Sequence, residues 1–265
     1  MKLKKRFIKC MIILLALMVN ISCTLNETNH NTEVDSYDAQ ITTRSGVEWD
    51  YPVKPGSEEW RMTSYDYKIE KSQPPKWLLA SWSIEVLFRF CIDYPFNKVT
   101  LLFNNPNDGF KRAYEQSSVW KEFIQRKDAL EVFAQFIEAR PYKLLFEITD
   151  IEVCNNELFT LFFLEKVVSE TDFVGYLNST DKKKLADIIL RNHQDKKNYP
   201  QEFFGFPYNS SLTTLLKILE SENIVSSKGD YSLTSFREKT GNEYFVDDEL
   251  DLAITTLTSN YVNKQ

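Results

Sequence analysis

The chain has 265 residues and a formal net charge of −6, from 32 basic and 38 acidic residues. Five of the basic residues and none of the acidic ones precede residue 23, so the remainder carries −11. This acidity excludes nucleic acid as a partner, because phosphate binding requires a concentrated basic surface. It also predicts that the body of the protein is kept off anionic lipid.

The first 23 residues have the pattern of a bacterial lipoprotein signal. A lysine-rich start is followed by an apolar run over residues 10–19 and by Asn20-Ile21-Ser22-Cys23. The run is too short for a membrane span and has the flanks of a secretory signal. A small residue directly before a cysteine resembles a lipobox. The resemblance implies cleavage of residues 1–22 and a lipid, including palmitate, on Cys23, and multiple acyl chains there would anchor the protein firmly.

Two cysteines remain once Cys10 is removed and Cys23 is modified. Cys91 and Cys154 both lie within apolar helical patterns. An exported protein can form a disulfide, but a buried cysteine also behaves as a small apolar side chain. The pattern favours two buried thiols over a disulfide.

The region between Cys23 and the helices changes composition near residue 45. Residues 23–45 are polar and are predicted to form a flexible lipidated tether. Residues 46–75 then combine prolines and Gly56 with aromatic side chains such as Trp49 and Trp60. We predict an extended aromatic strap there, with one short helix over residues 57–63, packed against the helices that follow.

From residue 77 onward, apolar residues recur at helical spacing. Residues 157–168 are apolar nearly all round, which favours a central buried helix. The other predicted apolar faces are Ile84, Leu87, Phe88 and Cys91; Val119, Phe123 and Ile124; Leu130, Phe133 and Ile137; Leu185, Ile188 and Ile189; Leu212, Leu215, Leu216 and Leu219; and Leu250, Ile254, Leu257 and Tyr261.

Capping residues set the predicted helix starts. They are Ser83, Asp128 with Glu131 as a capping box, Ser179 or Thr180, and Ser210 or Ser211. Residues 231–236 alone are compatible with a short strand. The sequence therefore predicts an all-α fold in a single helical domain over residues 46–265. Its expected form is an irregular array of stacked antiparallel helices, HEAT-like or α–α superhelix-like.

Few residues have the character of a catalytic or metal-binding group. The body contains one histidine, His193, in a polar helix end where a histidine favours the helix dipole. Residues 104–109 superficially resemble a calcium loop, but a turn explains them more simply. The acidic residues 247–251 are expected to begin the last helix. We predict no catalytic residue, no metal and no cofactor.

An aromatic segment separates two of the predicted helices. Residues 199–208 contain two prolines, a glycine and five rings, those of Tyr199, Phe203, Phe204, Phe206 and Tyr208. If exposed, the rings would form a stacking platform for a glycan or an apolar peptide. The residue pattern favours the alternative, in which they fill the groove between neighbouring helices.

Three blocks of sequence carry a family resemblance. They are Tyr51-Pro52-Val53-Lys54-Pro55-Gly56-Ser57-Glu58-Glu59-Trp60, residues 75–95, and residues 109–129. Together they resemble a family of uncharacterised helical lipoproteins from Bacteroides-type bacteria. The resemblance implies a lipid-anchored protein of the cell outer membrane and implies no activity. A single acidic residue, Glu27, lies close after Cys23, so the periplasmic face and the cell surface both stay open.

These observations predict a non-enzymatic, lipid-anchored cell-envelope protein. We expect it to act as an interaction or scaffold module for a protein partner, with the membrane reached through Cys23. Two alternatives stay open: a carbohydrate-binding lipoprotein that uses the loop aromatics, and a carboxylate-based hydrolase. Paired carboxylates are abundant in the sequence, but their separation is a structural quantity.

Overall fold

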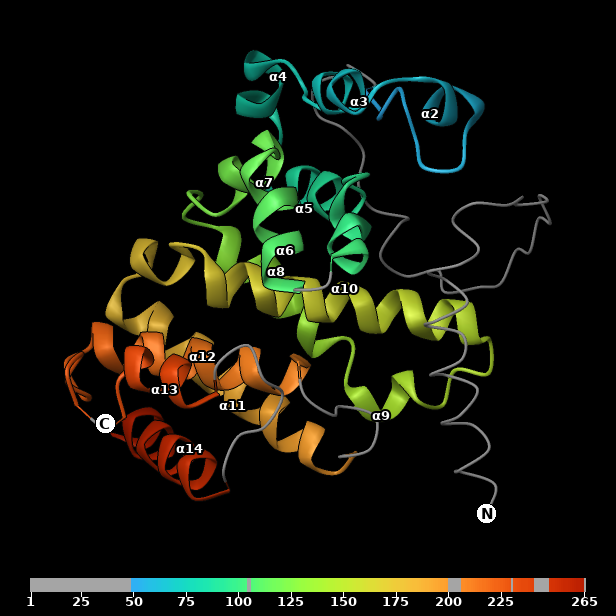
Figure 1. Cartoon of the computed structure of the whole chain (residues 1–265). Helices are drawn as coiled ribbons and strands as arrows, with labels where there is room; N and C mark the ends of the chain where they lie inside the picture. The colour runs from blue at the N-terminus through green and yellow to red at the C-terminus, as the bar shows by residue number, and fades with distance from the viewer. Residues whose placement is uncertain (1–48, 104–105, 200–205, 230, 241–247, 265) are drawn as a thin grey trace. The chain divides into compact units, whose positions relative to one another are not determined.

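A computed structural model describes residues 49–103, 106–199, 206–229, 231–240 and 248–264 (Figure 1). Helices and no strands occur among these residues, so the predicted all-α fold is confirmed. None of the helices in these ranges is both long and apolar enough to span a bilayer. The predicted signal and tether lie outside the described residues.

The chain divides into two compact units. Unit 1 is Met1–Arg126 and unit 2 is Lys127–Gln265, and each is described by itself. The single helical domain over residues 46–265 and the HEAT-like stacking stay predictions.

Unit 1 is built from short helices. They are α2 (Glu58–Met62), α3 (Tyr65–Lys71), α4 (Lys76–Ser81), α5 (Ile84–Ile92), the 3₁₀ helix η2 (Asn97–Leu102), α6 (Pro106–Glu115) and α7 (Ser118–Phe123). The predicted cap of α5 is confirmed, since the Ser83 hydroxyl accepts a hydrogen bond from the backbone N–H of Val86. Both α5 and α7 carry their predicted apolar residues into the core.

The aromatic strap packs against α5, as predicted. The buried Tyr51 hydroxyl donates to the backbone oxygen of Phe90 at 2.6 Å. The ring of Trp49 contacts Phe90 and Trp82, with centroids 5.3 and 5.8 Å apart. The predicted short helix is present as α2, capped by Ser57. Aromatic packing thus holds the first described residues of unit 1 against α5.

The strap is less extended than predicted, because a second helix, α3, follows the first. Its cap is Ser64, whose hydroxyl accepts from the backbone N–H of Tyr67. Neither α2 nor α3 contains a buried residue. A helix without a buried face leaves no apolar periodicity in the sequence, which is why the pattern missed it.

A buried amide connects the helices of unit 1. Asn97 in η2 donates to the backbone oxygen of Cys91 in α5 at 2.8 Å. Its side-chain oxygen accepts from the indole N–H of Trp120 in α7 at 3.0 Å. All the polar atoms of this amide are used, so α5, η2 and α7 are held in one arrangement.

Unit 2 contains the longer helices. They are α8 (Ala129–Glu138), α9 (Tyr142–Leu145), α10 (Ile151–Glu170), the 3₁₀ helix η3 (Phe173–Tyr176), α11 (Ser179–Lys197), α12 (Phe206–Ser221), α13 (Leu233–Thr240) and α14 (Asp248–Asn263). Helices α10, α11, α12 and α14 pack around a common core. The predicted central helix is α10, and its second half is buried.

Several helix starts in unit 2 differ from the prediction. The N-cap of α11 is Asn178, which precedes the predicted Ser179 and accepts from the backbone N–H of Asp181. The Asp128 side chain makes no capping hydrogen bond, so the capping box does not form. Glu131 instead pairs with Lys184 of α11 at 2.6 Å.

The two remaining differences concern α12 and α13. Helix α12 begins at Phe206, so the predicted capping serines, Ser210 and Ser211, lie inside the helix and are buried. Residues 231–236, which were compatible with a short strand, do not form one. Leu233 begins α13, and the Ser232 hydroxyl accepts from the backbone N–H of Ser235. The capping hydrogen bond of Ser232 thus marks the start of a helix in a segment whose apolar residues alternate as in a strand.

One glycine in unit 1 permits a close helix approach. Gly109 lies in α6 against η2, and a Cβ added to it would lie 2.6 Å from the backbone oxygen of Thr100. Backbone atoms cannot yield as a flexible side chain can, so any larger residue must push the two helices apart.

We therefore expect Gly109→Ala to lower the free energy of unfolding by about 1–3 kcal/mol, as overpacking does. The control is Gly175→Ala, because an added Cβ there meets no heavy atom within 4 Å. Urea denaturation followed by circular dichroism measures both variants. Equal stability of the two would contradict the tight α6–η2 approach.

Candidate functional site: a buried charge network

The core of unit 2 contains an ion pair with no exposed surface. Glu165 of α10 and Lys196 of α11 form a direct salt bridge, and both side chains are 0% exposed. A charge moved out of water costs several kcal/mol unless other groups replace its hydration. The surrounding side chains must therefore provide hydrogen bonds to both charges.

Three neutral side chains complete this set. The oxygen Oε1 of Glu165 accepts from the Tyr142 hydroxyl and from the Asn192 amide, each at 3.2 Å. Its other oxygen, Oε2, accepts from Lys196 and, at 3.2 Å, from the hydroxyl of Ser211. Lys196 also donates to Ser211 at 2.8 Å. We call these five residues the Glu165 network; they connect α9, α10, α11 and α12.

Burial changes the proton affinities within the network. Desolvation lowers the pKa of Lys196, and the neighbouring Glu165 carboxylate opposes that shift. Desolvation, reinforced by Glu165, raises the pKa of Tyr142 well above its usual value. Tyr142 therefore keeps its hydroxyl proton and acts as a donor to the carboxylate.

A second buried cluster lies one helical turn away on α11. Nε2 of His193 lies 3.1 and 3.2 Å from the two carboxylate oxygens of Asp251 in α14. Lys197 reaches the same carboxylate at 2.8 Å. His193 is 0% exposed and Asp251 is 3% exposed. Because an unprotonated nitrogen cannot donate to a carboxylate, this geometry places a proton on Nε2 of His193. The cluster fastens α14 to α11.

The protonation of His193 depends on groups from both helices. Desolvation lowers its pKa, Asp251 opposes the shift, and the two positive charges of Lys196 and Lys197 add to it. The net shift is downward, so the imidazole is neutral at pH 7.

The spacing of residues in α11 indicates that His193 and Lys196 are buried, but their polar side chains are not counted when a helical face is identified from apolar residues. Leu185, Ile189, His193 and Lys196 continue one helical face at spacings of four, four and three residues. The same face is buried from Leu185 to Lys196. His193 does lie near the C-terminal end of its helix, as predicted, but it is buried there, because a helical face stays in phase whether its residues are apolar or polar.

The acidic residues at the start of α14 are partly exposed and partly buried. Asp248 and Glu249 are exposed in the first turn, as predicted for acids near a helix start. Asp251 turns inward to His193 instead. Residue 247 lies outside the described residues.

The predicted aromatic platform is described only in part. Tyr199 is half-buried, and its ring packs against Phe146 with centroids 4.7 Å apart. Phe203 and Phe204 lie outside the described residues. Phe206 and Tyr208 belong to the first turn of α12, contrary to the predicted loop, and their side chains are not described.

Cys91 and Cys154 are buried and are not joined by a disulfide, as the pattern favoured. The Sγ atom of Cys154 lies 3.3 Å from the backbone oxygen of Leu145. Burial raises the pKa of the Cys91 thiol well above its usual value. A thiol held in its protonated form inside a core acts as an apolar side chain and is a poor nucleophile.

The chemistry available to the Glu165 network follows from its burial. A serine beside a lysine is found in some hydrolases, where the serine must reach a substrate. Ser211 is 0% exposed, and its hydroxyl is occupied by Lys196 and Glu165. Among the described residues, no three His, Cys, Asp or Glu side chains are grouped to hold a metal ion. The network is suited to holding four helices in register.

Breaking the central pair should destabilise unit 2 strongly. We expect Lys196→Met to lower the free energy of unfolding by about 3–5 kcal/mol, because Glu165 is left as an unpaired buried charge. The double variant Glu165→Leu/Lys196→Met should recover part of that loss. Urea denaturation measures all the variants.

The matched control for this prediction is Lys184→Met, which removes an exposed lysine–glutamate pair from the same helix. Exposed pairs contribute little, so this variant should unfold almost as the original chain does. Equal losses for Lys184→Met and Lys196→Met would contradict a dominant role for the buried pair.

The lowered pKa of His193 makes stability dependent on pH. Since the histidine pKa is about 6.5 in an unfolded chain and lower here, the unfolded state binds more protons below that pH. Stability should therefore be constant above about pH 6.5 and fall as the pH decreases below it. His193→Gln should remove this slope, whereas His30→Gln should leave it in place. Denaturant midpoints between pH 5 and pH 8 measure the effect, and an unchanged slope in His193→Gln would rule out His193 as its source.

Comparison with known proteins leaves this site to be interpreted from its geometry. No family model, no curated protein and no solved structure matches the chain. Buried charges that join α10, α11, α12 and α14 thus form the basis on which a function is assigned.

Proposed function

We propose that this chain is a lipid-anchored scaffold of the bacterial cell envelope. Cys23 carries the lipid that attaches it to the outer membrane, and unit 2 presents a rigid helical surface to a protein partner. No catalytic step is part of this function.

The burial of the Glu165 network is the observation that carries the proposal. Its charged groups pair with one another inside the core, where they oppose rotation or sliding of the helices. A surface held in one shape loses less conformational freedom on binding, so more of the contact energy appears as affinity. That property is useful to a scaffold.

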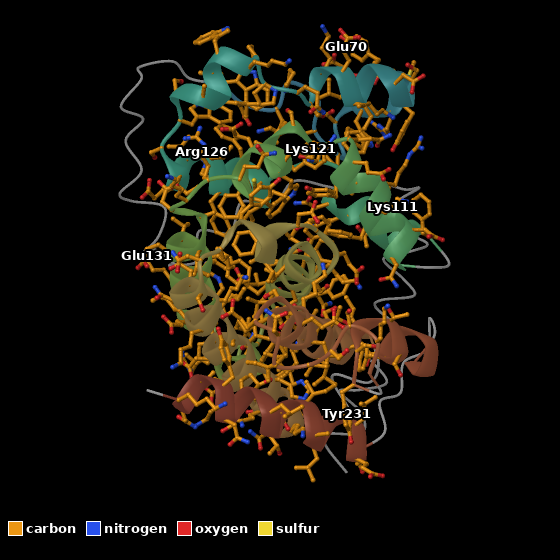
Figure 2. All side chains as sticks on the ribbon, turned by 90° about the vertical axis from the view of Figure 1, so that its left-hand side faces the viewer. Glu70, Lys111, Lys121, Arg126, Glu131 and Tyr231 are labelled. Atoms are coloured by element: carbon orange, nitrogen blue, oxygen red, sulfur yellow. The ribbon has the colours of Figure 1, made fainter. Side chains whose placement is uncertain are left out.

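The exterior of unit 2 supports a protein as the partner. Residues 127–265 contain 23 acidic and 15 basic residues, so this unit carries most of the negative charge. Large apolar side chains are exposed within this acidic surface, at Leu144, Ile151, Tyr176, Tyr231 and Leu252 (Figure 2 labels Tyr231). Apolar anchors within a charged surround are typical of transient protein interfaces. A partner with a basic rim fits this surface.

The alternatives have less support from the described residues. The two carboxylates with the most elaborate surroundings, Glu165 and Asp251, are buried and paired, which does not suit a hydrolase. Tyr199 uses its ring to pack against Phe146, which does not suit a sugar platform.

Two measurements in the native cell test the proposal. Radiolabelled palmitate should be incorporated into the original chain and not into Cys23→Ala, and only the original should sediment with outer membranes. A photoreactive residue placed at Leu144, Tyr176 or Leu252 should then form an adduct with one protein in stoichiometric amount. The yield of the adduct should fall at high salt, because salt screens the attraction between an acidic surface and a basic rim.

Either half of the proposal can fail separately. Palmitate on the Cys23→Ala variant would contradict the anchor. The absence of an adduct at all three positions, in a chain that is lipidated and folded, would contradict the scaffold role.

A further inference from the structure

Unit 1 has an outer layer of three short helices, two of which, α2 and α3, contain no buried residue. Helices α2, α3 and α4 lie along one side of the unit, with α5, α6 and α7 behind them (Figures 1 and 2). Four large apolar side chains in this layer face solvent, and Met62 is 80% exposed and Trp77 63% exposed. The others are Tyr65 and Tyr67. Exposed apolar side chains on consecutive short helices are candidates for an interaction surface.

The chemistry of this layer matches a membrane interface. Tryptophan and tyrosine are enriched at the headgroup level of bilayers, and lysine side chains extend from there into water. In α3, the Nζ atom of Lys68 lies 4.9 Å from the centroid of Trp60 in α2. The Nζ atom of Lys71 lies 5.4 Å from the centroid of Tyr67. Glu70 points outward at the edge of the layer (Figure 2), so the surface would lie at the headgroups and not within the acyl chains.

Charge is divided unequally between the two units. Residues 49–126 contain 11 basic and 10 acidic residues, whereas residues 127–265 contain 15 and 23. Residues 58–77 contain four of each sign. The acidity that was expected to keep the whole body off anionic lipid therefore belongs to unit 2 and to residues 24–48. Residues 49–126 have no net repulsion from such a membrane.

The position of Cys23 identifies the occupant of this surface. Only residues 24–48 separate Cys23 from Trp49, a distance of at most about 90 Å even for a fully extended chain. Trp49 itself packs against Trp82, which directly follows α4. The first described residue of the chain thus lies beside the end of α4. A lipid on Cys23 would therefore keep α2–α4 at high local concentration near the bilayer.

We propose that α2, α3 and α4 bind the surface of the bilayer in which the Cys23 lipid is inserted. Met62, Tyr67 and Trp77 enter the headgroup region, and the surrounding charges stay in water. Tyr65 stays on the protein side, because its hydroxyl donates to Gln116 and its ring packs against Phe96. Contact through apolar side chains of a nearly neutral surface should depend little on salt. This inference uses the proposed function only for the lipid on Cys23.

The test attaches the chain to lipid chemically. The chain from Cys23 onward is coupled through its one accessible thiol to a maleimide phospholipid, since Cys91 and Cys154 are buried. The vesicles contain phosphatidylethanolamine and phosphatidylglycerol in a three-to-one ratio, and the reference is the same chain coupled to a soluble maleimide. Hydrogen exchange read by mass spectrometry should be slower over residues 58–77 on vesicles, at both low and high salt.

Matched variants separate this surface from the rest of the protein. Met62→Ser and Trp77→Ser should each reduce the vesicle protection by roughly tenfold, the effect of keeping one large apolar side chain in water. Leu252→Ser and Tyr176→Ser remove comparably exposed side chains from unit 2 and should leave the protection unchanged.

Three results would overturn the proposal. They are equal exchange in the two coupled forms, protection that disappears at high salt, and equal effects of the two pairs of variants. A photoadduct between Trp77 and a protein, without vesicle protection, would assign the surface to a protein partner instead. Because the lipid is attached chemically, these outcomes do not depend on palmitate labelling of Cys23 in the cell, so the anchor and this surface fail separately.

Discussion

The pairing of Glu165 with Lys196 is the constraint on which the arrangement of unit 2 depends. Each oxygen of the carboxylate accepts from side chains on helices other than its own: Tyr142 from α9, Asn192 and Lys196 from α11, and Ser211 from α12. An apolar core tolerates small rotations because dispersion contacts are not directional. A buried charge does not, since a shifted helix would leave it unpaired. The network therefore selects one register among those that the apolar faces allow, although it adds little stability over an apolar core of the same shape.

Helix α11 extends that constraint to the C-terminal helix. Lys196 and Lys197 are neighbours in sequence, yet they bind carboxylates on different helices, Glu165 and Asp251. His193 belongs to the cluster around Asp251, and the positive charges of both lysines lower its pKa. A proton on His193 would meet these two charges in a buried site, and only Asp251 would favour it. The attachment of α14 is thus a part of unit 2 that acid should weaken.

Apolar periodicity predicted the main helices because it measures burial of a continuous face. It located α5, α7, α10 and α14 from their apolar residues alone. It could not identify the Glu165 network, because Lys196 and Ser211 occupy buried positions with side chains that are normally exposed. It also could not identify α3, whose residues bury no face and whose start depends on one serine. The lipid on Cys23 stays a prediction, since residues 1–48 lie outside the described residues. The family resemblance stays a prediction because no family model, curated protein or solved structure matches the chain.

The division of charge changes how the acidity of the whole chain is interpreted. A net charge averaged over 265 residues describes neither part well, because the excess acid lies in unit 2 and in residues 24–48, while residues 49–126 are nearly neutral. A lipid on Cys23 would limit how far unit 1 moves from the bilayer without selecting which side of it faces the lipid. A second, weak contact through α2–α4 would select that side, and it can be weak because tethering replaces bulk concentration by a local concentration on the order of millimolar. Strong attraction between this surface and the lipid is then not required. Residues 58–77 carry equal numbers of positive and negative charges, with Met62 and Trp77 exposed among them. In the proposed arrangement, such a surface binds the bilayer only when the lipid on Cys23 holds it there.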